Sequence, residues 1–594
     1  MIRILYSCFF LLAVLFSSCQ KTDKSTEKEE AQRPNVILIM TDDQGYGDLA
    51  CLGNKYIKTP NLDKLYSQST SLTDFHVGTT CAPTRSSLMT GKHFNKVGVW
   101  HTINGRSLLR KEEKTVANVF ADAGYNTGIF GKWHLGDNYP FRPQDRGFQE
   151  VWVHGGGGVT QAPDYWGNDY FDDTYYHNGH PEKVEGYCTD VWFGKAIDFI
   201  DKNKDKPFFC YIPTNAPHGP LFVDEKYSEP YRGNENVPSA EFNGMITNID
   251  ENVGLLEAYL QKNNLADNTI LIFMTDNGTA NGVRLNGKGF VEKGFNANMR
   301  GKKGSNYEGG HRVPFFIRWP QGGLSKKAEI TQNTIVTDVL PTLIDLCGIE
   351  VSKDLQFDGT SLKPLLYGNK APWKDRMLMV DTQREYDLKK YKRPSVMFNE
   401  WRLVNGDELY NIVEDPAQAI NVADQYPDRV EAMKAGYEEL WEDVSVNKDE
   451  ISRIVVGVQD ENPLRLSSHD WAGTSSVPWN QGHVRSGVKL NGFWNLTVAE
   501  AGEYEISLCR WPRSFFKTLR WGDPNNEAGN FKPINIQTAK LKIGENELSK
   551  PISERDKEAK FHVSLRAGDT ILQTWFDDGS PETFGAYYVY ITKV

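Results

Sequence analysis

Short apolar runs that end abruptly in polar clusters recur through the first half of the chain. They are NVILIM at 35–40, TGIF at 127–130, PFFCYI at 207–212 and TILIFM at 269–274. Runs of this length, continuous in β-branched and aromatic residues, are typical of strands buried on both faces, as in a parallel sheet. The pattern therefore predicts four buried strands.

Segments with helical spacing separate these runs, at 61–69, 114–124, 190–203 and 242–263. The repetition of strand and helix predicts an α/β fold with helices on both faces of the sheet. Ligands of such sheets gather at the carboxyl ends of the strands. We therefore expect the polar clusters at those ends to meet. They are Asp42 and Asp43, Gly131 to His134, Pro213 to His218, and Thr275 to Gly278.

The pattern changes after about residue 370. Short strand-like runs lie between 376 and 412, and a helix is predicted from about 427 to 443. From about 450 the chain alternates strands with turns, which predicts a β-sandwich. At 594 residues the chain exceeds what one hydrophobic core usually serves. We expect a main α/β domain at 34–372, a smaller α+β subdomain at 373–446 and an additional β-sandwich domain at 447–594.

The N-terminus is typical of an exported protein. Residues 1–19 are predicted to be a signal peptide of the lipoprotein type: Arg3 precedes an apolar stretch from Ile4 to Phe16 that is too short to span a bilayer comfortably, and small residues follow before Cys19. Phe16-Ser17-Ser18-Cys19 resembles a bacterial lipobox, in which the cysteine is lipidated; ordinary cleavage nearby is the alternative. Residues 20–33 are strongly charged and predict a disordered tether. We expect a periplasmic protein or a lipoprotein of the outer membrane or cell surface, attached to the membrane only through a lipid anchor.

Charge and cysteine spacing exclude several classes of function. The formal net charge of −11 offers no basic field for a phosphate backbone, so we expect no nucleic-acid partner. The six cysteines after Cys19 are scattered without a CxxC pair, which indicates neither a zinc site nor a disulfide framework. Cys210, inside an apolar run, is expected to be a buried small hydrophobe, and a single Cys188–Cys210 disulfide stays open.

Hard oxygen ligands follow two of the predicted strands. Asp42 and Asp43 follow the first strand, and Asp276 and Asn277 follow the last. Either pair alone is common in turns, but together at neighbouring strand ends they indicate a site for Ca²⁺ or Mg²⁺ rather than zinc. A thiolate is a poor ligand for such a metal, so Cys81, in the polar stretch TTCAPTRSS, does not fit as it stands.

The residues around Cys81 carry a motif with a known parallel. Cys81-Ala82-Pro83-Thr84-Arg85, continued by SSLMTG, resembles the type I sulfatases of the alkaline phosphatase superfamily, whose C-x-P-x-R cysteine is oxidised to formylglycine. The resemblance covers about residues 34–445 and implies an alkaline-phosphatase-like fold, with the catalytic domain at 34–372 and the family's C-terminal subdomain at 373–446. Its other motifs are Asp42-Asp43, GKWHLG at 131–136, Pro217-His218, Asp276-Asn277-Gly278, RGKKGSNYEGGHRVP at 300–314 and DELYNIVEDPAQAINVA at 407–423.

The resemblance implies a mechanism and a cofactor. The aldehyde made from Cys81 would be hydrated to a geminal diol, one oxygen of which attacks sulfur and displaces the substrate alcohol. Deprotonation of the other hydroxyl would then expel sulfate and restore the aldehyde. One calcium ion would be held by Asp42, Asp43, Asp276, Asn277 and the modified Cys81. A formylglycine-generating maturation enzyme is an implied partner.

The resemblance also assigns the remaining catalytic residues. Arg85 would orient and stabilise the diol, and His134 would be the base for sulfate elimination. Lys132, Lys303 and His218 would bind sulfate oxygens, and one of these three would protonate the leaving alcohol. Lys303 is chosen over Lys302 because it immediately precedes Gly304, where the family's lysine stands.

Further segments are candidates for substrate contacts. HGGGG at 154–158 looks like a lipase oxyanion loop, but no G-x-S-x-G elbow accompanies it, so a flexible loop near the pocket is expected. The segment 162–180, rich in aromatic and acidic residues, either lines sugar subsites or packs as an ordered loop. The segments 469–471 and 478–487 either extend over the active-site mouth, bind carbohydrate or pack inside the sandwich. The candidate substrate contacts are His154, Trp166, Asp169 and Tyr170.

These features together lead us to expect an exported sulfatase acting on sulfated polysaccharide or oligosaccharide, with ulvan as an example suggested by the resemblance. A phosphonate monoester or phosphodiester hydrolase of the same superfamily is one alternative. The lysines and histidines at sulfatase-like positions favour a sulfate ester over it. A non-catalytic carbohydrate-binding surface protein is the other alternative; it requires a missing catalytic group, and none is missing.

Overall fold

The main sheet of the computed structural model has ten strands within the described residues, in the order β13-β2-β12-β9-β1-β8-β4-β5-β6-β7. The structure describes residues 33–368, 373–474, 476–523 and 531–594. The predicted signal peptide, Cys19 and residues 20–32 of the predicted tether lie outside these ranges. In the described part, no helix combines the length and the hydrophobicity needed to span a membrane.

The centre of this sheet is parallel and its flanks are mixed. The parallel strands are β9 (Thr269–Thr275), β1 (Asn35–Thr41), β8 (Phe208–Pro213), β4 (Asn126–Lys132) and β5 (Glu150–His154). The flanking strands are β13 (Ala328–Ile330), β2 (Thr70–Leu72), β12 (Phe315–Arg318), β6 (Thr174–His177) and β7 (His180–Lys183). The four predicted buried strands are thus neighbours in the sheet, and their carboxyl ends lie at one edge.

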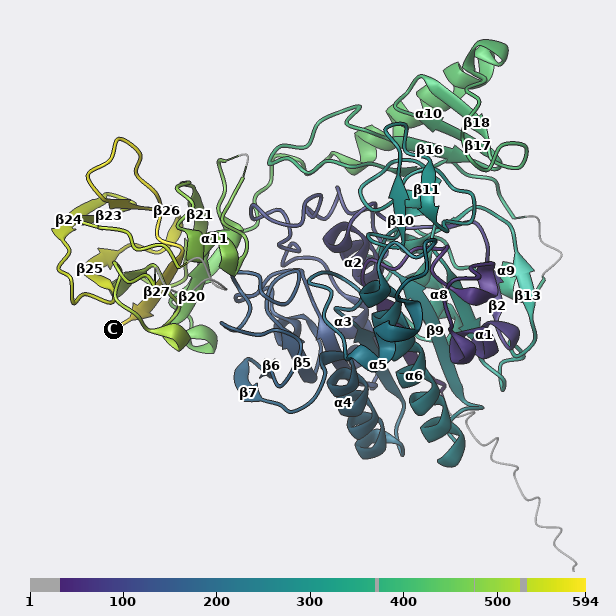
Figure 1. The fold of residues 1–594 in the computed structure, drawn as a ribbon, viewed down its shortest axis with the longest axis horizontal. Helices are drawn as coiled ribbons and strands as arrows, with labels where there is room; N and C mark the ends of the chain where they lie inside the picture. The colour runs from purple at the N-terminus through teal and green to yellow at the C-terminus, as the bar shows by residue number, and fades with distance from the viewer. Residues whose placement is uncertain (1–32, 369–372, 475, 524–530) are drawn as a thin grey trace, which may run out of the picture. The chain divides into compact units, whose positions relative to one another are not determined.

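Alternation along β1 shows how the sheet separates two cores. Val36, Leu38 and Met40 pack in one cluster, and Ile37 and Ile39 pack in another. The first cluster includes side chains of α2 (Cys81–Thr90), α3 (Val116–Asp122) and α8 (Val339–Leu346); the second includes α1 (Pro60–Ser67), α4 (Cys188–Asn203) and α6 (Ala240–Lys262). Figure 1 shows α4 and α6 side by side. Helices therefore cover both faces of the sheet, as the sequence predicts.

Smaller elements complete this part of the chain. They are β3 (Phe75–His76), β14 (Thr334–Ile335), α5 (Glu225–Ser228), β10 (Val283–Leu285), β11 (Val291–Gly294), α7 (Glu308–His311) and α9 (Lys363–Leu366). The antiparallel pair β10 and β11 lies in the segment that leads from β9 to Lys303.

A four-stranded antiparallel sheet follows, packed on a single long helix. Its strands are β15 (Leu378–Val380), β16 (Ser395–Phe398), β17 (Trp401–Val404) and β18 (Glu408–Asn411), and the helix is α10 (Pro427–Val444). Val430, Met433 and Tyr437 of α10 share a hydrophobic cluster with residues of the sheet. Because α10 carries apolar residues three and four positions apart, one of its faces is buried and the other is solvated.

The last part of the chain forms two sheets that pack around a separate hydrophobic core. We call these two sheets and their core the β-sandwich. One sheet has the order β19-β21-β26-β23-β24 and the other β20-β27-β22-β25. Alternation in β25, buried at every second position, is the pattern of a strand with one face in the core. The strands are β19 (Ile454–Val456), β20 (Leu464–Ser467), β21 (Phe493–Val498), β22 (Gly502–Cys509), β23 (Thr538–Ile543), β24 (Asn546–Pro551), β25 (Ala559–Leu565), β26 (Gly568–Asp577) and β27 (Tyr588–Lys593), with the short helix α11 (Gln481–Ser486).

The predicted α/β fold with a C-terminal α+β part and a β-sandwich is confirmed. All six cysteines of the described residues are free thiols, so the Cys188–Cys210 bridge left open above is not formed. Cys210 is fully buried in β8, in keeping with a small hydrophobe. Residues 34–594 pack as one unit, so contacts between the β-sandwich and the main sheet belong to the described structure.

Candidate active site

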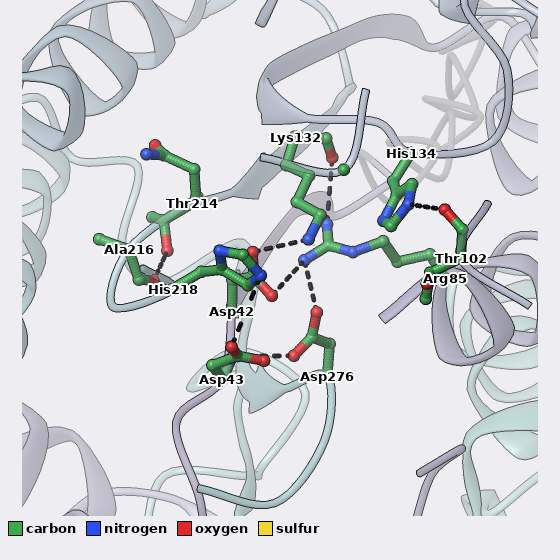
Figure 2. A network of polar contacts seen from close by, with 12 residues as sticks. Asp42, Asp43, Arg85, Thr102, Lys132, His134, Thr214, Ala216, His218 and Asp276 are labelled. Carbon is green, nitrogen blue, oxygen red and sulfur yellow. Dashed lines mark hydrogen bonds and ion pairs between the residues drawn. The ribbon is translucent and has the colours of Figure 1, made fainter. Parts of the chain in front are cut away.

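The polar residues that follow β1 and β9 lie together at the carboxyl edge of the main sheet (Figure 2). Asp42 and Asp43 follow β1, and Asp276 follows β9. Ligand atoms of these three acids and of Cys81 all lie within 4.8 Å of one another, and all four residues are buried. The backbone N–H of Asp43 donates to Oδ1 of Asp276 at 3.1 Å, which holds the two strand ends against each other.

Cys81 is the first residue of α2, all ten residues of which are buried. Burial, followed by the charge of Asp42, raises the pKa of the Cys81 thiol to about 12. A thiol with this pKa is not ionised at neutral pH, so Cys81 as it stands is not a thiolate nucleophile. Its place among oxygen ligands suits an oxygen-bearing derivative better than sulfur.

Each acid of the cluster is paired with a cation. The pairs are Lys132 Nζ with Asp42 Oδ2 at 2.7 Å, Lys303 Nζ with Asp43 Oδ2 at 2.8 Å, and Arg85 Nη2 with Asp276 Oδ2 at 2.7 Å. Arg85 also donates from Nη1 to the carbonyl oxygen of Lys132 at 3.1 Å. Because the three negative charges are already balanced, a bound divalent cation makes this site positive and able to attract an anion.

The donor set fits a hard divalent cation. Oδ1 of Asp42 and Oδ1 of Asn277 are buried and have no hydrogen-bond partner among the described residues. Such acceptors are costly to bury unless something satisfies them, and a cation would do so. Burial and the nearby charge of Asp42 raise the pKa of Asp276 to about 6, although Arg85 opposes the shift. Crowded carboxylates of this kind are relieved by a positive ion, and oxygen donors suit Ca²⁺ or Mg²⁺.

His134 lies two residues beyond β4, beside Lys132 and Arg85 (Figure 2). Its Nε2 is 2.9 Å from the carbonyl oxygen of Thr102, and a carbonyl only accepts, so Nε2 carries the proton. Nδ1 is buried without a partner among the described residues and is therefore the free lone pair. Burial, and then the charge of Lys132, hold the pKa of His134 well below its ordinary value. The ring is a neutral base whose basic atom is Nδ1.

Two glycines determine how closely the surrounding backbone approaches. A Cβ on Gly157 would lie 2.3 Å from the ring of His134, so only glycine lets the 155–158 loop cover that ring. Gly131 has a φ of 134°, and a Cβ there would lie 2.0 Å from the carbonyl oxygen of Pro213. The end of β4, with Lys132, can thereby pack directly against β8.

His218 and Lys303 line the solvent-facing side of the cluster. Their side chains are 21% and 17% exposed, whereas that of Lys132 is fully buried. Nδ1 of His218 donates to the carbonyl oxygen of Gly219, and Nε2 faces Oδ2 of Asp43 at 3.7 Å. Burial, and next the charge of Lys303, lower the pKa of His218. The site is therefore entered past these two side chains.

The structure places Lys303, and not Lys302, at the acidic cluster. Nζ of Lys302 instead donates to the carbonyl oxygen of Ala280 at 3.1 Å. The backbone of Lys303 is anchored by its N–H to the carbonyl of Thr279, and that of Gly304 to the carbonyl of Thr79. These bonds hold the lysine beside the strand end that carries Asp276.

Three of the four predicted substrate contacts are buried. His154 is 1% exposed and is the register partner of Lys132 on β5, with Nδ1 donating to the carbonyl of Gly155. Tyr170 is also buried, and its hydroxyl donates to the carbonyl oxygen of His218 at 2.8 Å, so it supports His218 from behind. Asp169 is the exposed member of the four.

Trp166, the remaining predicted contact, packs into the core of the β-sandwich. Its ring stacks on Phe515 with centroids 5.2 Å apart and meets Trp511 edge-on at 5.5 Å. The residue belongs to the cluster that fills the sandwich. Trp166 therefore serves packing of the β-sandwich, one of the two roles that the sequence left open for the segment 162–180.

A second buried cluster escaped the sequence analysis, because His76 of β3 is far along the chain from Glu308 and His311, which share α7. His76, Glu308 and His311 bring ligand atoms within 4.8 Å of one another. Arg402 already fills this cluster: its Nε donates to Glu308 at 2.8 Å and its Nη2 to Asp74 at 2.7 Å. Since the carboxylates are paired with a guanidinium, the cluster fastens β17 to the main sheet and is a structural network.

The fold and the site together define an alkaline-phosphatase-like hydrolase, with its reacting groups at the carboxyl edge of a mostly parallel sheet. The sulfatase family profile matches residues 34–349, more than half of the chain. A second profile, described as N-sulphoglucosamine sulphohydrolase, C-terminal, matches residues 302–443. The chain belongs to the sulfatase family, a class of sulfate ester hydrolases.

Individual relatives agree with this assignment. Arylsulfatase A of Homo sapiens is 31% identical over 367 residues, covering 58% of this chain and 69% of its own length. Arylsulfatase G of Mus musculus is 30% identical, covering 61% and 73%. The chain spans 63% of the length of the arylsulfatase of Hemicentrotus pulcherrimus, at 30% identity. The crystal structure of Ps i-CgsB in complex with k-i-k-neocarrahexaose has a TM-score of 0.62 at 30% identity, covering 69% of this chain and 93% of that chain.

Proposed function

We propose that the protein hydrolyses sulfate esters of carbohydrates, with residue 81 matured to formylglycine and one calcium ion bound. The observation that carries the proposal is the setting of Cys81. The carboxylates of Asp42, Asp43 and Asp276 lie within 4.8 Å of its sulfur. Each of these carboxylates is paired with a cationic side chain, from Lys132, Lys303 and Arg85 respectively. As an unmodified thiol it has neither the ionisation nor the ligand chemistry for this place.

Asp42, Asp43, Asp276 and Asn277 would hold the ion through their oxygens, as their crowding and their unsatisfied acceptors support. When present, the ion and the matured side chain supply an oxygen nucleophile next to a Lewis acid. Arg85 fixes the position of residue 81, because its guanidinium joins Asp276 to the backbone of Lys132.

Lys132, Lys303 and His218 bind the sulfate oxygens. Lys132 is fully buried, whereas Lys303 and His218 lie at the entrance, where the alcohol departs. The proton donor to that alcohol is therefore one of the two entrance residues. His134 accepts a proton at Nδ1 during release of sulfate, since this nitrogen is its free lone pair.

The substrate we propose is a polyanionic sugar chain. The solved structure of Ps i-CgsB, a relative at 30% identity, contains k-i-k-neocarrahexaose. In this chain two exposed arginines, Arg384 and Arg393, flank Gly304, which follows Lys303. Nη2 of Arg393 donates to the carbonyl oxygen of Gly304 at 2.9 Å. Nη2 of Arg384 lies 3.8 Å from the position that a Cβ on residue 304 would take. Two arginines beside a sulfate-binding lysine support binding of a second anionic group of the same chain.

A phosphonate monoester or phosphodiester hydrolase remains the alternative activity. The phosphonate monoester hydrolase of Agrobacterium radiobacter is 21% identical to this chain, and the likeness is one of fold. Family membership favours sulfate. Sulfate monoesters, phosphodiesters and phosphonate monoesters each carry one negative charge, so comparing their turnover is what separates the two activities.

The test is to produce the chain with a formylglycine-generating enzyme and to verify the modification at residue 81 by peptide mass spectrometry. Sulfate release is then measured from an aryl sulfate and from defined carrageenan- and ulvan-derived oligosaccharides, with an aryl phosphodiester as the rival substrate. A matched Cys81→Ser preparation controls for contaminating activity. We expect sulfate release that a calcium chelator abolishes and calcium restores. Verified formylglycine without sulfate release, or faster phosphodiester turnover, contradicts the proposal.

A further inference from the structure

The β-sandwich places a histidine beside the active site. His469 and Asp470 lie between β20 and β21, beyond residue 443 where the family matches end. His469 is 1% exposed, and its ring centroid lies 6.3 Å from that of His134. An imidazole from the C-terminal part of the chain is therefore the neighbour of the residue we assign as the base.

His469 and Asp470 form a histidine–carboxylate pair. Nδ1 of His469 is 3.0 Å from Oδ1 of Asp470, and a carboxylate accepts, so Nδ1 carries a proton. Nε2 of His469 is buried and has no partner among the residues the structure describes. The same is true of Nδ1 of His134. Two neighbouring rings thus each keep one unsatisfied nitrogen, which is unusual in a packed interior unless the atoms are used.

One loop, residues 102–106, connects the two histidines. The carbonyl of Thr102 accepts the hydrogen bond from His134, and the backbone N–H of Asn104 donates to the carbonyl of His469 at 3.0 Å. The side-chain amide of Asn104 also donates to the carbonyl of Thr474 at 3.3 Å. The loop that orients His134 is therefore held in place by the β-sandwich.

We propose that His469, backed by Asp470, is a positioning residue of the active site that acts through His134, so that the β-sandwich completes the catalytic apparatus. This inference rests on the proposed role of His134 in sulfate ester hydrolysis. Burial alone would lower the pKa of His469, but Asp470 raises it above the ordinary value. When His469 is protonated on both ring nitrogens, its charge opposes protonation of His134, 6.3 Å away between ring centroids, and keeps Nδ1 of His134 free to accept a proton.

Other charges face the same two rings and must be considered with them. Lys132 and Arg85 act on His134 from β4 and α2, while Asp137 acts on His469. His101, whose pKa burial lowers to about 4, lies within the influence of both His469 and Arg384. None of these groups is altered by substitution at 469, so a change in the titration of His134 in that variant reports on His469 itself.

The experiment compares the full-length wild-type chain with His469→Gln, Asp470→Asn and, as a control, His562→Gln. The side chain of His562 is 71% exposed on β25 of the same sandwich. The pH dependence of kcat for sulfate release is measured on the matured, calcium-loaded chains. In parallel, the His134 ring is titrated by NMR with labelled histidine in chains that retain Cys81, with His134→Gln to assign its signal. Thermal unfolding checks that each variant is folded.

In His469→Gln we expect the acid limb of the kcat profile and the NMR pKa of His134 to move up by about one to two pH units. That is the size expected for one charge about 6 Å away at an effective dielectric constant of about 20. Asp470→Asn should shift both in the same direction by less, and His562→Gln should shift neither. The kcat profile of His562→Gln should coincide with that of the wild-type chain at every pH, because this side chain is exposed to solvent on β25.

An unchanged NMR pKa in a folded His469→Gln chain overturns the inference, and so does a kcat loss that is equal at every pH. If His469→Gln does not fold, the NMR pKa of His134 and the acid limb of the kcat profile in Asp470→Asn decide whether the inference holds. A wild-type chain that releases no sulfate contradicts the proposed function instead, while the NMR titration still decides whether His469 acts on His134.

Discussion

Replacing Lys303 by methionine removes one of the three cations around the acidic cluster and keeps the length of the side chain. Its Nζ lies 2.8 Å from Oδ2 of Asp43, and the side chain is 17% exposed. Asp43 depends on this neighbour: burial alone would raise its pKa, but Lys303, His218 and Lys132 hold it well below its usual range. Lys303 also faces the entrance through which we propose that sulfate binds.

The size of the effect follows from the kind of contact that is lost. A hydrogen bond to a charged group contributes about 1.5–3 kcal/mol, which corresponds to roughly 10- to 140-fold in kcat/KM at about 1.4 kcal/mol per tenfold change. The partial exposure of Lys303 favours the lower half of this range. We therefore expect Lys303→Met to reduce kcat/KM for aryl sulfate by about 10- to 40-fold.

Lys302 is the matched control. It is the adjacent residue with the same charge, but its Nζ bonds the carbonyl of Ala280 and not Asp43. Lys302→Met should keep kcat/KM within about threefold of wild type when both variants carry equal formylglycine content by mass spectrometry. The assay is continuous release of an aryl alcohol at several substrate concentrations. Loss of activity in Lys302→Met with retention in Lys303→Met would refute the geometry of the site.

Three further predictions concern the substrate, the scaffold and the pH dependence of stability. The double variant Arg384→Gln/Arg393→Gln should raise KM for sulfated oligosaccharides severalfold and leave KM for a small aryl sulfate unchanged; equal effects on both substrates would exclude a second anion subsite. Arg402→Met should destabilise the fold by about 3–5 kcal/mol in urea unfolding because it leaves Asp74 and Glu308 buried without their partner. The exposed pair of Arg232 with Glu225 is the control, for which Arg232→Met should cost no more than about 1 kcal/mol. Burial lowers the pKa of His93 from 6.5 to about 4, so the unfolded chain takes up its proton first as the pH falls. Stability from this group is therefore present above pH 6.5 and lost between pH 6.5 and 4, at up to about 1.4 kcal/mol per pH unit. Urea unfolding at a series of pH values should show a smaller slope in His93→Gln, and an unchanged slope would contradict this account.

Much of the fold was predictable because it depends on local patterns. A continuous apolar run such as 269–274 is compatible only with burial on both faces, and it became the strand β9. The helix predicted at about 427–443 is observed as Pro427–Val444. Strands with a weaker pattern were missed: β24, at Asn546–Pro551, has no fully buried position, so its sequence carries little hydrophobic signal.

The candidate site was predictable for a related reason. Carboxyl ends of neighbouring parallel strands must lie at one edge, so Asp42 and Asp276 could be placed together from the order of the segments alone. The resemblance of the 81–91 segment to known sulfatases supplied the role that we propose for Cys81, which spacing could not. Trp166 shows where this reasoning stops: an aromatic residue in a polar loop has the same local sequence whether it contacts a sugar or packs against Trp511.

The sequence by itself predicted the buried strands of the main sheet, the helices on both of its faces and the meeting of Asp42, Asp43, Asp276 and Asn277 at one edge, because apolar periodicity and strand polarity are local properties of the chain. Only the tertiary structure decided which nitrogen of His134 is free and that His469 lies beside it. These depend on contacts between residues separated by up to hundreds of positions. Such contacts are set by packing and hydrogen bonding of the whole molecule, so they cannot be predicted from a local sequence pattern.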